Sequence, residues 1–579
     1  MNKDEKLSNL RHSLAHLLAA AVLDLWPDAK RAIGPAIENG FYYDFEFSKP
    51  ISEEDIPKIE AKMKEILPTW SEFEKSDVSA DEARKLFKDN PYKQELIDEY
   101  ADEGLTTHKS GEYIDLCRGG HVDDAKEIDP DGFKLTHTAG AYWRGDEKNT
   151  MLTRIYGLAF ETQKELEKHL EMLEEAKKRD HKKIGPQLDL FTFSDLVGSG
   201  LPLWTPKGTL LRNILDDFVW ELRREHGYEK VEIPHITKKE LYEKSGHWDK
   251  FQEELLEIET REGHLFAMKP MNCPHHTQIY DRKLWSYREL PQRYANTTMC
   301  YRDEQTGELS GLSRARAFTQ DDAHVFCRQD QIQEEFLKIW DIVDEFYKAV
   351  GFELKVNLSL HDPDESEKYL GTPEIWKEAE NTLRDIAKER GVKAEEIIGE
   401  AAFYGPKIDF MANDSIGRQW QLATIQLDMN LPERFDLTCI NEKGEKERIF
   451  MIHAAIMGSI ERYLSILIEH FAGAFPLWLS PVQVKVLTIS DKQNDYAQEV
   501  AKELKEEDIR VEIDNSNETI GKKIRETEMQ KVPYIVIVGD KELKDKKIAV
   551  RKRSEGDIGV MSLDDFEERL EKEIEEKII

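Results

Sequence analysis

The spacing of hydrophobic and polar residues changes three times along the chain and predicts four segments. Up to about residue 160, short helix-like and strand-like patterns mix, and residues 161–183 then form a charged helical run that ends at Gly185-Pro186. A long aromatic-rich stretch follows, with apparent strands such as EKVEIPHI, KIDFMA and RQWQLATIQLD, which predicts one large domain on an antiparallel or mixed sheet. Beyond Pro481, strand and helix patterns alternate and predict a small α/β domain. The predicted class is therefore multidomain α+β, with domains at 1–160, 188–479 and 480–579 and a linker helix at 161–187.

Length and composition support this division and exclude several classes. A chain of 579 residues is too long for one core, and 39% apolar residues are enough to build several. No window approaches the roughly 18 apolar residues of a membrane helix, and the N-terminus lacks the apolar core of a signal peptide. We therefore expect a cytoplasmic protein without a membrane partner.

The charge balance restricts how the chain could contact nucleic acid. With 82 basic and 116 acidic residues, the net charge of −34 excludes nonspecific attraction to a polyanion as the main mode of action. One local basic stretch, residues 541–553, lies on the last strand predicted in the chain and the turn before it. It is either an edge strand protected by lysines or a local RNA contact, and its place on a compact module favours RNA.

The cysteines are odd in number and far apart, which argues for reduced thiols or metal ligands and against a disulfide framework. They are Cys117, Cys273, Cys300, Cys327 and Cys439.

The N-terminal segment contains two groups of candidate chemical residues. His12 and His16 are four residues apart in an apolar helical pattern, so they share a helix face. In YIDLCRGGH, Asp115, Cys117 and His121 surround a glycine turn. These side chains could bind zinc or could act without metal as bases that activate water, and the residues alone do not decide. The upstream lysines, Lys93 and Lys109, are most simply surface residues.

The central segment contains three fragments whose order is informative. They are GYEKVEIP, then YRDE followed by RARAFTQDDAH, and finally HAAIMGSIERY. Each fragment alone is weak, because an arginine near a glutamate is usually a surface ion pair.

Together these fragments resemble the three signature motifs of class II aminoacyl-tRNA synthetases, and the whole chain resembles threonyl-tRNA synthetases of the bacterial type. HSLAH and DLCRGGH match the editing domain, and MNCPHH, FTQDDAH, AFYGPKIDF, QWQLATIQLDMNLPERF and HAAIMGSIER match the catalytic domain. The resemblance implies an α/β editing domain, a class II antiparallel-sheet catalytic domain and a C-terminal α/β anticodon-binding domain.

The resemblance implies a two-step reaction. The threonine carboxylate attacks the ATP α-phosphate, and a terminal ribose hydroxyl of tRNA(Thr) then takes the threonyl group. By match, Arg302 binds the α-phosphate, Glu304 the adenine amino group, Phe318 one face of the base, and Arg462 its other face and the γ-phosphate. Mg²⁺ is expected with ATP. Further matched residues are Gln320 and Asp322 as catalytic residues, and Met271, Arg314, Tyr404, Lys407, Gln421, Thr424, Gln426 and Ser459 as ATP or substrate ligands.

The resemblance also implies one zinc ion per subunit, held by Cys273, His324 and His453. Three protein ligands leave open positions that the amino and hydroxyl groups of L-threonine can fill, and Asp322 accepts a hydrogen bond from the same hydroxyl. Valine lacks the hydroxyl, and such a site rejects it by roughly 10⁴–10⁵. The adjacent His275 and His276 are not expected to be ligands, and Cys300 and Cys327 are expected to be packed thiols.

Serine also carries the hydroxyl that this pocket selects, so a second site that removes serine is expected. The resemblance makes the N-terminal group an editing centre that hydrolyses seryl-tRNA(Thr), composed of His12, His16, Lys93, Asp115, Cys117 and His121. We predict that this centre works without metal, although its donors would also serve as a zinc set.

Three features of the resemblance concern partners and domain content. The matched anticodon readers are Asn517, Glu542 and Arg551, and Pro234 matches the dimer interface, so a homodimer is expected. The N-terminal TGS domain usual in this family is absent from the sequence, and the initiator-like Met1 favours a natural absence over trimming.

Three other readings share part of these signals. A related synthetase for proline or serine would carry the same three motifs. A catalytically silent paralogue could bind RNA, although it would be free to lose the ATP and zinc residues. A hydrolase that only deacylates tRNA would explain residues 1–160 and leave the remainder without a role.

Overall fold

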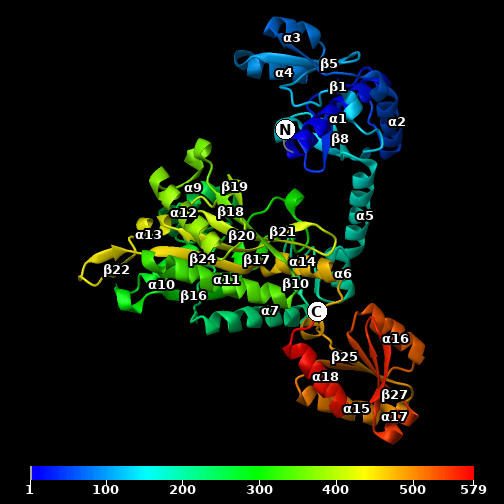
Figure 1. Cartoon of the computed structure of the whole chain (residues 1–579), viewed down its shortest axis with the longest axis vertical. Coiled ribbons are helices and arrows are strands. Elements are labelled where there is room, and N and C mark those ends of the chain that lie inside the picture. Colours follow the sequence, from blue (N-terminus) through cyan, green and yellow to red (C-terminus); the bar gives the residue numbers. More distant parts are fainter. Residues whose placement is uncertain (1–2) are drawn as a thin grey trace. The chain divides into compact units, whose positions relative to one another are not determined.

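The computed structural model describes residues 3–579 and divides into two compact units, Met1–Glu174 and Glu175–Ile579 (Figure 1).

The first unit is built on a long N-terminal helix and two antiparallel sheets. Helix α1 (Lys3–Leu25) buries one apolar side against strand β3 and packs beside α2 (Ile56–Ile66). The first sheet has the order β1-β3-β8-β7, with β2 paired to β3, and the second has the order β4-β5-β6. Their bounds are β1 Lys30–Arg31, β2 Ala36–Ile37, β3 Gly40–Glu46, β7 Phe133–Tyr142, β8 Met151–Ala159, β4 Glu74–Val78, β5 Leu105–Ser110 and β6 Tyr113–Leu116; helices α3 Ala80–Leu86 and α4 Pro91–Tyr100 accompany the second sheet.

The predicted linker helix is two helices, α5 (Gln163–Arg179) and α6 (His181–Gln187). The break falls at Asp180, whose side chain accepts a hydrogen bond from the backbone N–H of Lys182 and so caps α6. Helix α6 also continues through Gly185-Pro186, where the sequence predicted its end, and ends one residue later at Gln187.

The second unit contains an eight-stranded sheet in the order β11-β16-β17-β24-β21-β20-β18-β19. The central pairs are antiparallel and the two outermost pairs are parallel, so the sheet is mixed, as predicted. The run EKVEIPHI forms two short strands rather than one. The bounds are β11 Glu229–Lys230, β16 Gln292–Tyr301, β17 Ala317–Cys327, β24 Phe450–Ser459, β21 Gln419–Asp428, β20 Lys407–Asn413, β18 Leu354–Leu360 and β19 Glu395–Ile398.

Helices cover this sheet and complete its core. Helix α11 (Ile332–Ala349) packs on the sheet and beside α7 (Pro206–Glu225) and α12 (Pro373–Glu389), as Figure 1 shows. Helix α14 (Ile460–Phe471) follows β24 directly and begins where the Ser459 hydroxyl accepts a hydrogen bond from the backbone N–H of Arg462. The shorter elements around this core are β9 Phe191–Thr192, β10 Leu203–Trp204, β12 Ile236–Lys238, β13 Glu257–Glu259, β14 Leu265–Met268, β15 Trp285–Ser286, β22 Thr438–Ile440, β23 Lys446–Arg448, α8 Lys239–Ser245, α9 His247–Phe251, α10 Cys273–Tyr280 and α13 Asn430–Arg434.

The C-terminal α/β sheet has the order β26-β25-β27-β28-β29. It contains one strand and one helix more than the sequence predicted, β29 and α17. Strand β28, which carries part of the basic stretch, is therefore neither the last strand nor an edge, and the edge-protection reading of residues 541–553 is wrong. The bounds are β25 Val484–Thr488, β26 Val511–Asp514, β27 Tyr534–Val538, β28 Ile548–Lys552, β29 Gly556–Met561, α15 Asn494–Glu506, α16 Ile520–Met529, α17 Asp540–Asp545 and α18 Leu563–Glu575.

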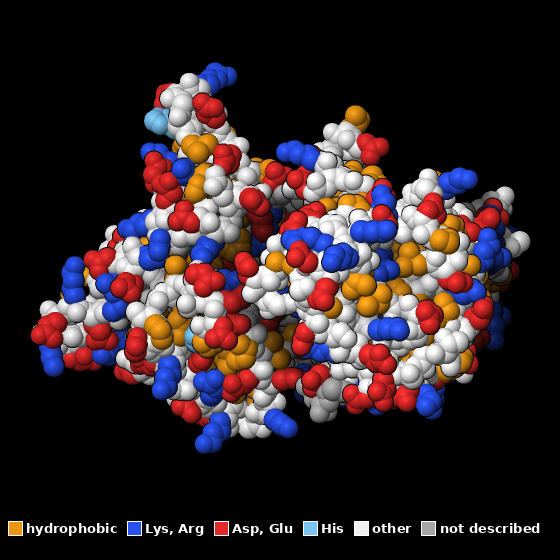
Figure 2. Space-filling model, turned by 90° about the horizontal axis from the view of Figure 1, so that it is seen from above, with side chains coloured by type: hydrophobic (Ala, Val, Ile, Leu, Met, Phe, Trp, Pro, Cys, Tyr) orange, Lys and Arg blue, Asp and Glu red, His pale blue; other side chains and the backbone are white. Residues whose placement is uncertain are grey.

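Within residues 3–579, no helix has both the length and the apolar character needed to cross a bilayer. On the face shown in Figure 2, acidic and basic side chains are interspersed, which agrees with local rather than general contact with nucleic acid.

Candidate functional site

Three residues far apart in sequence bring a thiol and two imidazoles together in the second unit. Cys273 begins α10, His324 lies in β17 and His453 in β24, and the register of the two antiparallel strands places the histidines side by side. All three are buried, and their donor atoms lie within 4.8 Å of one another. The predicted zinc residues thus converge.

Neighbouring side chains orient the two imidazoles. His453 Nε2 lies 2.8 Å from Asp428 Oδ2, and the backbone N–H groups of Asn430 and Leu431 donate to the other oxygen of this carboxylate. Because a carboxylate only accepts, His453 Nε2 carries the proton and its Nδ1 lone pair points into the cluster, 3.1 Å from His324 Nε2. The far nitrogen of His324 lies 2.8 Å from His276 Nδ1.

Burial controls the protonation of this cluster. It raises the pKa of the Cys273 thiol well above its ordinary value and lowers the pKa of His324 well below. It also raises the pKa of Asp322 to about 6. A buried thiolate therefore needs a cation beside it, and the combination of one sulfur, two nitrogens and a carboxylate behind His453 fits zinc.

The cluster opens into a cavity of about 370 Å³. Arg302 lines it with its guanidinium over the Phe318 ring, 5.2 Å from the ring centre. Tyr404 stacks on His453 with ring centres 4.7 Å apart, and its hydroxyl donates to Gln426. The other predicted residues that line the cavity are Met271, Gln320, Asp322 and Thr424.

The remaining predicted ATP and substrate residues do not line this cavity. Glu304 is paired with Arg314, whose Nε lies 2.6 Å from the carboxylate. Lys407 and Gln421 both contact Asp409, a buried carboxylate that sequence reasoning missed, at 2.8 and 2.7 Å. Ser459 and Arg462 lie together at the start of α14.

Sequence reasoning also missed His247, Asn272 and Asp428. His247 lines the cavity with Nε2 3.9 Å from Cys273 Sγ, and Asn272 donates to Asp322 at 3.1 Å. No spacing signal identifies these residues, because each is brought to the site by a different element. As expected, Cys300 and Cys327 are packed thiols with no exposed surface.

The first unit gathers a second cluster of His12, His16, Cys117 and His121, whose donor atoms also lie within 4.8 Å of one another. The His12 Nδ1–H donates to the carbonyl of Gly120, which leaves Nε2 with a lone pair. The Cys117 sulfur lies 3.2 Å from His121 Nε2 and 3.1 Å from the Nδ1 of His108, a residue that sequence reasoning missed.

A buried ion cluster supports this second site. Asp115 lies 2.8 Å from Lys93 Nζ and 3.3 Å from Arg31 Nε, and accepts hydrogen bonds from Tyr43 and from Tyr113 at 2.8 Å. Burial opposes ionisation of Asp115, but the charges of Lys93 and Arg31 outweigh it and lower the pKa of this carboxyl. Lys93 is only 2% exposed, so its interpretation as a surface residue is wrong, whereas Lys109 is exposed.

The groups of the second cluster are neutral near pH 7. Burial, followed by the nearby histidines, lowers the pKa of His121, and burial lowers the pKa of His12 and His16. Burial raises the pKa of the Cys117 thiol to about 12. Neutral imidazoles with lone pairs can accept a proton from water, as a general base does.

The predicted anticodon residues lie in the C-terminal α/β module. Asn517 is exposed in the turn after β26, Glu542 is half-buried in α17 and accepts from the backbone N–H of Gly539, and Arg551 is half-buried in β28. Arg553, at the end of the basic stretch, instead turns inward to the backbone carbonyl of Phe475.

Three models of known protein families match parts of the chain. The tRNA synthetase class II core domain (G, H, P, S and T) matches residues 256–471, the anticodon binding domain matches 483–573, and the threonyl and alanyl tRNA synthetase second additional domain matches 106–156.

Relatives match over nearly the whole chain. The threonine–tRNA ligase of Porphyromonas gingivalis is 50% identical over 574 residues, which is 98% of this chain and 88% of the relative. That of Cytophaga hutchinsonii is 48% identical over 583 residues, covering 100% and 90%. A crystal structure of the RNA binding domain of threonyl-tRNA synthetase from Cryptosporidium parvum is 39% identical, covers 68% of this chain and 98% of that one, and has a TM-score of 0.65. With its motifs, its two clusters and these relatives, the chain belongs to the threonine–tRNA ligases, a family of class II aminoacyl-tRNA synthetases.

Proposed function

We propose that this chain activates L-threonine with ATP, transfers the threonyl group to tRNA(Thr), and hydrolyses seryl-tRNA(Thr) at a second site. The observation that carries the first part is the convergence of Cys273, His324 and His453 on one wall of a cavity that Arg302 also lines. An amino acid held at the cluster would then lie within the same cavity as the guanidinium proposed to bind the ATP α-phosphate.

In the first step a threonine carboxylate oxygen bonds to the α-phosphorus and pyrophosphate leaves. Arg302 stabilises the charge that develops on the phosphate, and its stacking on Phe318 holds the guanidinium in one orientation. Arg462, at the start of α14, covers the adenine and meets the γ-phosphate. In the second step a tRNA ribose hydroxyl attacks the threonyl carbonyl carbon and AMP leaves, with Mg²⁺ arriving as part of the ATP complex.

The amino-acid pocket distinguishes threonine by its hydroxyl. A zinc ion bound to Cys273, His324 and His453 would offer open coordination positions to the amino and hydroxyl groups of the substrate. Asp322 accepts a hydrogen bond from the substrate hydroxyl, and Asn272 holds this carboxylate in place. Valine leaves these polar groups unmatched, whereas serine satisfies them, so serine requires the second site.

The second site removes serine by hydrolysis. His12 or His16 takes a proton from a water molecule as its oxygen attacks the seryl ester carbonyl, and then returns this proton to the tRNA ribose oxygen as the ester bond breaks. Lys93, held by Asp115, provides a positive charge beside the developing oxyanion. We propose that this site works without metal, because the Cys117 sulfur lies at hydrogen-bond distance from two imidazoles.

The proposal also includes the partners of the C-terminal module and of the class II motifs. Asn517, Glu542 and Arg551 read the anticodon, since side chains of these types can bind exposed base edges in a single-stranded loop. Pro234 is exposed between β11 and β12, where it is available to a second copy of the chain in a homodimer.

Amino-acid-dependent ATP–pyrophosphate exchange tests the function directly. Threonine should support exchange strongly, serine weakly, and valine and proline not at all. Exchange supported equally by proline or valine would overturn the amino-acid assignment, and an absence of exchange with every amino acid would favour a silent RNA-binding paralogue.

A further inference from the structure

The loop between β16 and β17 includes residues 305–316, whose tip folds back onto two helices. Leu312 at the tip is 1% exposed and belongs to the large core of the second unit. Its backbone N–H donates to His181 Nε2 of α6 at 3.1 Å. Next to it, the Ser313 hydroxyl lies 2.9 Å from that of Ser465 in α14, which in turn donates to the carbonyl of Arg462. The tip is thus tied to the helix that carries Arg462.

His181 has one defined tautomer in this arrangement. Because Nε2 accepts from an N–H group, the ring proton is on Nδ1, which donates to Glu469 Oε1 of α14 at 2.6 Å. The same oxygen accepts from the backbone N–H of His181 at 3.1 Å. His181 is 3% exposed, so water does not replace either contact. One buried ring therefore connects the loop tip to α14.

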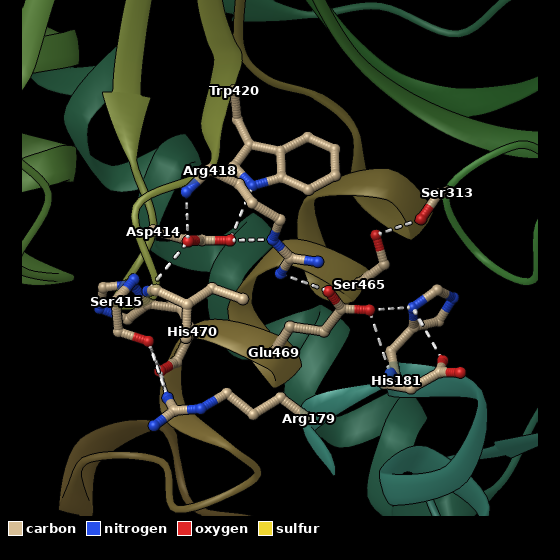
Figure 3. Close-up of polar contacts among 12 residues, drawn as sticks. Arg179, His181, Ser313, Asp414, Ser415, Arg418, Trp420, Ser465, Glu469 and His470 are labelled. Atoms are coloured by element: carbon tan, nitrogen blue, oxygen red, sulfur yellow. Dashed lines mark hydrogen bonds and ion pairs between the residues drawn. The ribbon is translucent and has the colours of Figure 1, made fainter. Parts of the chain in front are cut away.

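Figure 3 shows that the side chains around His181 and Glu469 also have polar partners. The second oxygen of Glu469 accepts from Arg418 at 2.5 Å, and Arg418 also pairs with Asp414 at 2.7 Å. Asp180 lies 3.9 Å from the His181 ring. Asp180, His181 and Glu469 could form a metal-ligand set, but the His181 nitrogens and both Glu469 oxygens already have protein partners, which indicates a positioning role.

The loop tip packs closely against the His181 ring at Gly311. Gly311 has a φ of +55°, and a Cβ atom there would lie 2.5 Å from His181 Nε2 and 2.8 Å from Lys182 Cγ. Any side chain at this position would push the tip away from His181. Three residues further along, Arg314 leaves the tip and pairs with Glu304.

We infer that His181 is a positioning residue for ATP binding: it holds the 305–316 loop against α14, so that Glu304 and Arg314 on one side and Arg462 on the other keep the spacing that the nucleotide requires. This inference rests on the proposed ATP roles of these three residues. His181 does not line the cavity beside Cys273, His324 and His453, so its effect should fall on ATP and not on threonine.

The test is ATP–pyrophosphate exchange with the full chain, in which KM for ATP and KM for threonine are measured separately and rates are normalised to active sites. His181→Asn keeps a donor near Nδ1 and loses the acceptor for Leu312, and KM for ATP should rise roughly two- to tenfold with KM for threonine unchanged. His181→Gln can place an acceptor near Nε2 and should recover part of this loss. Gly311→Ala should act like His181→Asn, since it displaces the same contact.

Two further variants separate the possible failures. Ser415→Ala is the matched control, because Ser415 belongs to the same cluster through His470 but contacts no part of the loop, and both KM values should stay at wild type. Arg314→Ala tests the underlying ATP role. If Arg314→Ala leaves KM for ATP unchanged, the proposed function of the loop is wrong. If it raises that KM while His181→Asn and Gly311→Ala do not, or if they raise both KM values equally, His181 has no specific positioning role.

Discussion

The two histidine and cysteine clusters contain similar donors but differ in burial and in the contacts of their thiols. In the second unit, all three side chains are buried, His247 Nε2 lies 3.9 Å from Cys273 Sγ, and Asp428 directs the His453 lone pair toward His324. In the first unit, His12 and Cys117 are partly exposed, and the thiol already lies within hydrogen-bond distance of two imidazoles. The longer contact at Cys273 favours a metal ion between these side chains, whereas the short contacts of Cys117 favour proton transfer.

Replacing Cys273 should have the largest effect on activity. For Cys273→Ser we expect loss of bound zinc and a fall in threonine-dependent exchange on the order of 10³-fold or more, because a metal supplies several kcal/mol. Elemental analysis and exchange kinetics measure both. Cys327→Ser is the control, since Cys327 is equally buried on the same strand but three residues from His324, and therefore on the opposite face. A Cys273→Ser protein with full zinc and full exchange would refute the metal assignment.

Replacing His12 and His16 together should affect only the cluster in the first unit. His12→Ala with His16→Ala should slow the hydrolysis of seryl-tRNA(Thr) by roughly 10²–10⁴-fold, the contribution of a general base, and leave threonylation intact. His137→Ala, at an exposed position of the same unit, provides the control. Undiminished hydrolysis would contradict the editing role. Hydrolysis by the wild-type protein that depends on added zinc would show that this cluster is also a metal site.

The smallest expected effect is that of replacing Asp428, whose carboxylate contacts His453. Asp428→Asn should weaken zinc binding by about 10–100-fold without changing the ligands, because it no longer fixes the tautomer of His453. Competition with a chelator measures this affinity. The control is Asp409→Asn, which removes a buried carboxylate from the neighbouring strand β20 that contacts Lys407 instead of a metal ligand. Equal affinities for the two variants would indicate that Asp428 does not orient His453.

Part of this architecture could be predicted from the sequence. The mixed sheet and the helix carrying His12 and His16 follow from local periodicity, and the family motifs around Cys273, His324 and His453 predicted that these three residues come together. No sequence pattern indicated Asp428, because its contact with His453 depends on the register of the strands. Lys93 was misinterpreted because lysines are seldom buried, and only the fold shows the charges around it. Strand β29 was missed because its sequence GDIGVM contains two glycines and lacks a regular alternation.

X-ray absorption at the zinc edge, recorded with and without threonine, measures the coordination on which the proposed selection of threonine depends. We expect one sulfur and two imidazole nitrogens around zinc, with two further nitrogen or oxygen ligands when threonine is added and only one when valine is added. Zinc whose coordination is the same with and without threonine, or a protein that binds no zinc at these residues, would contradict this proposal.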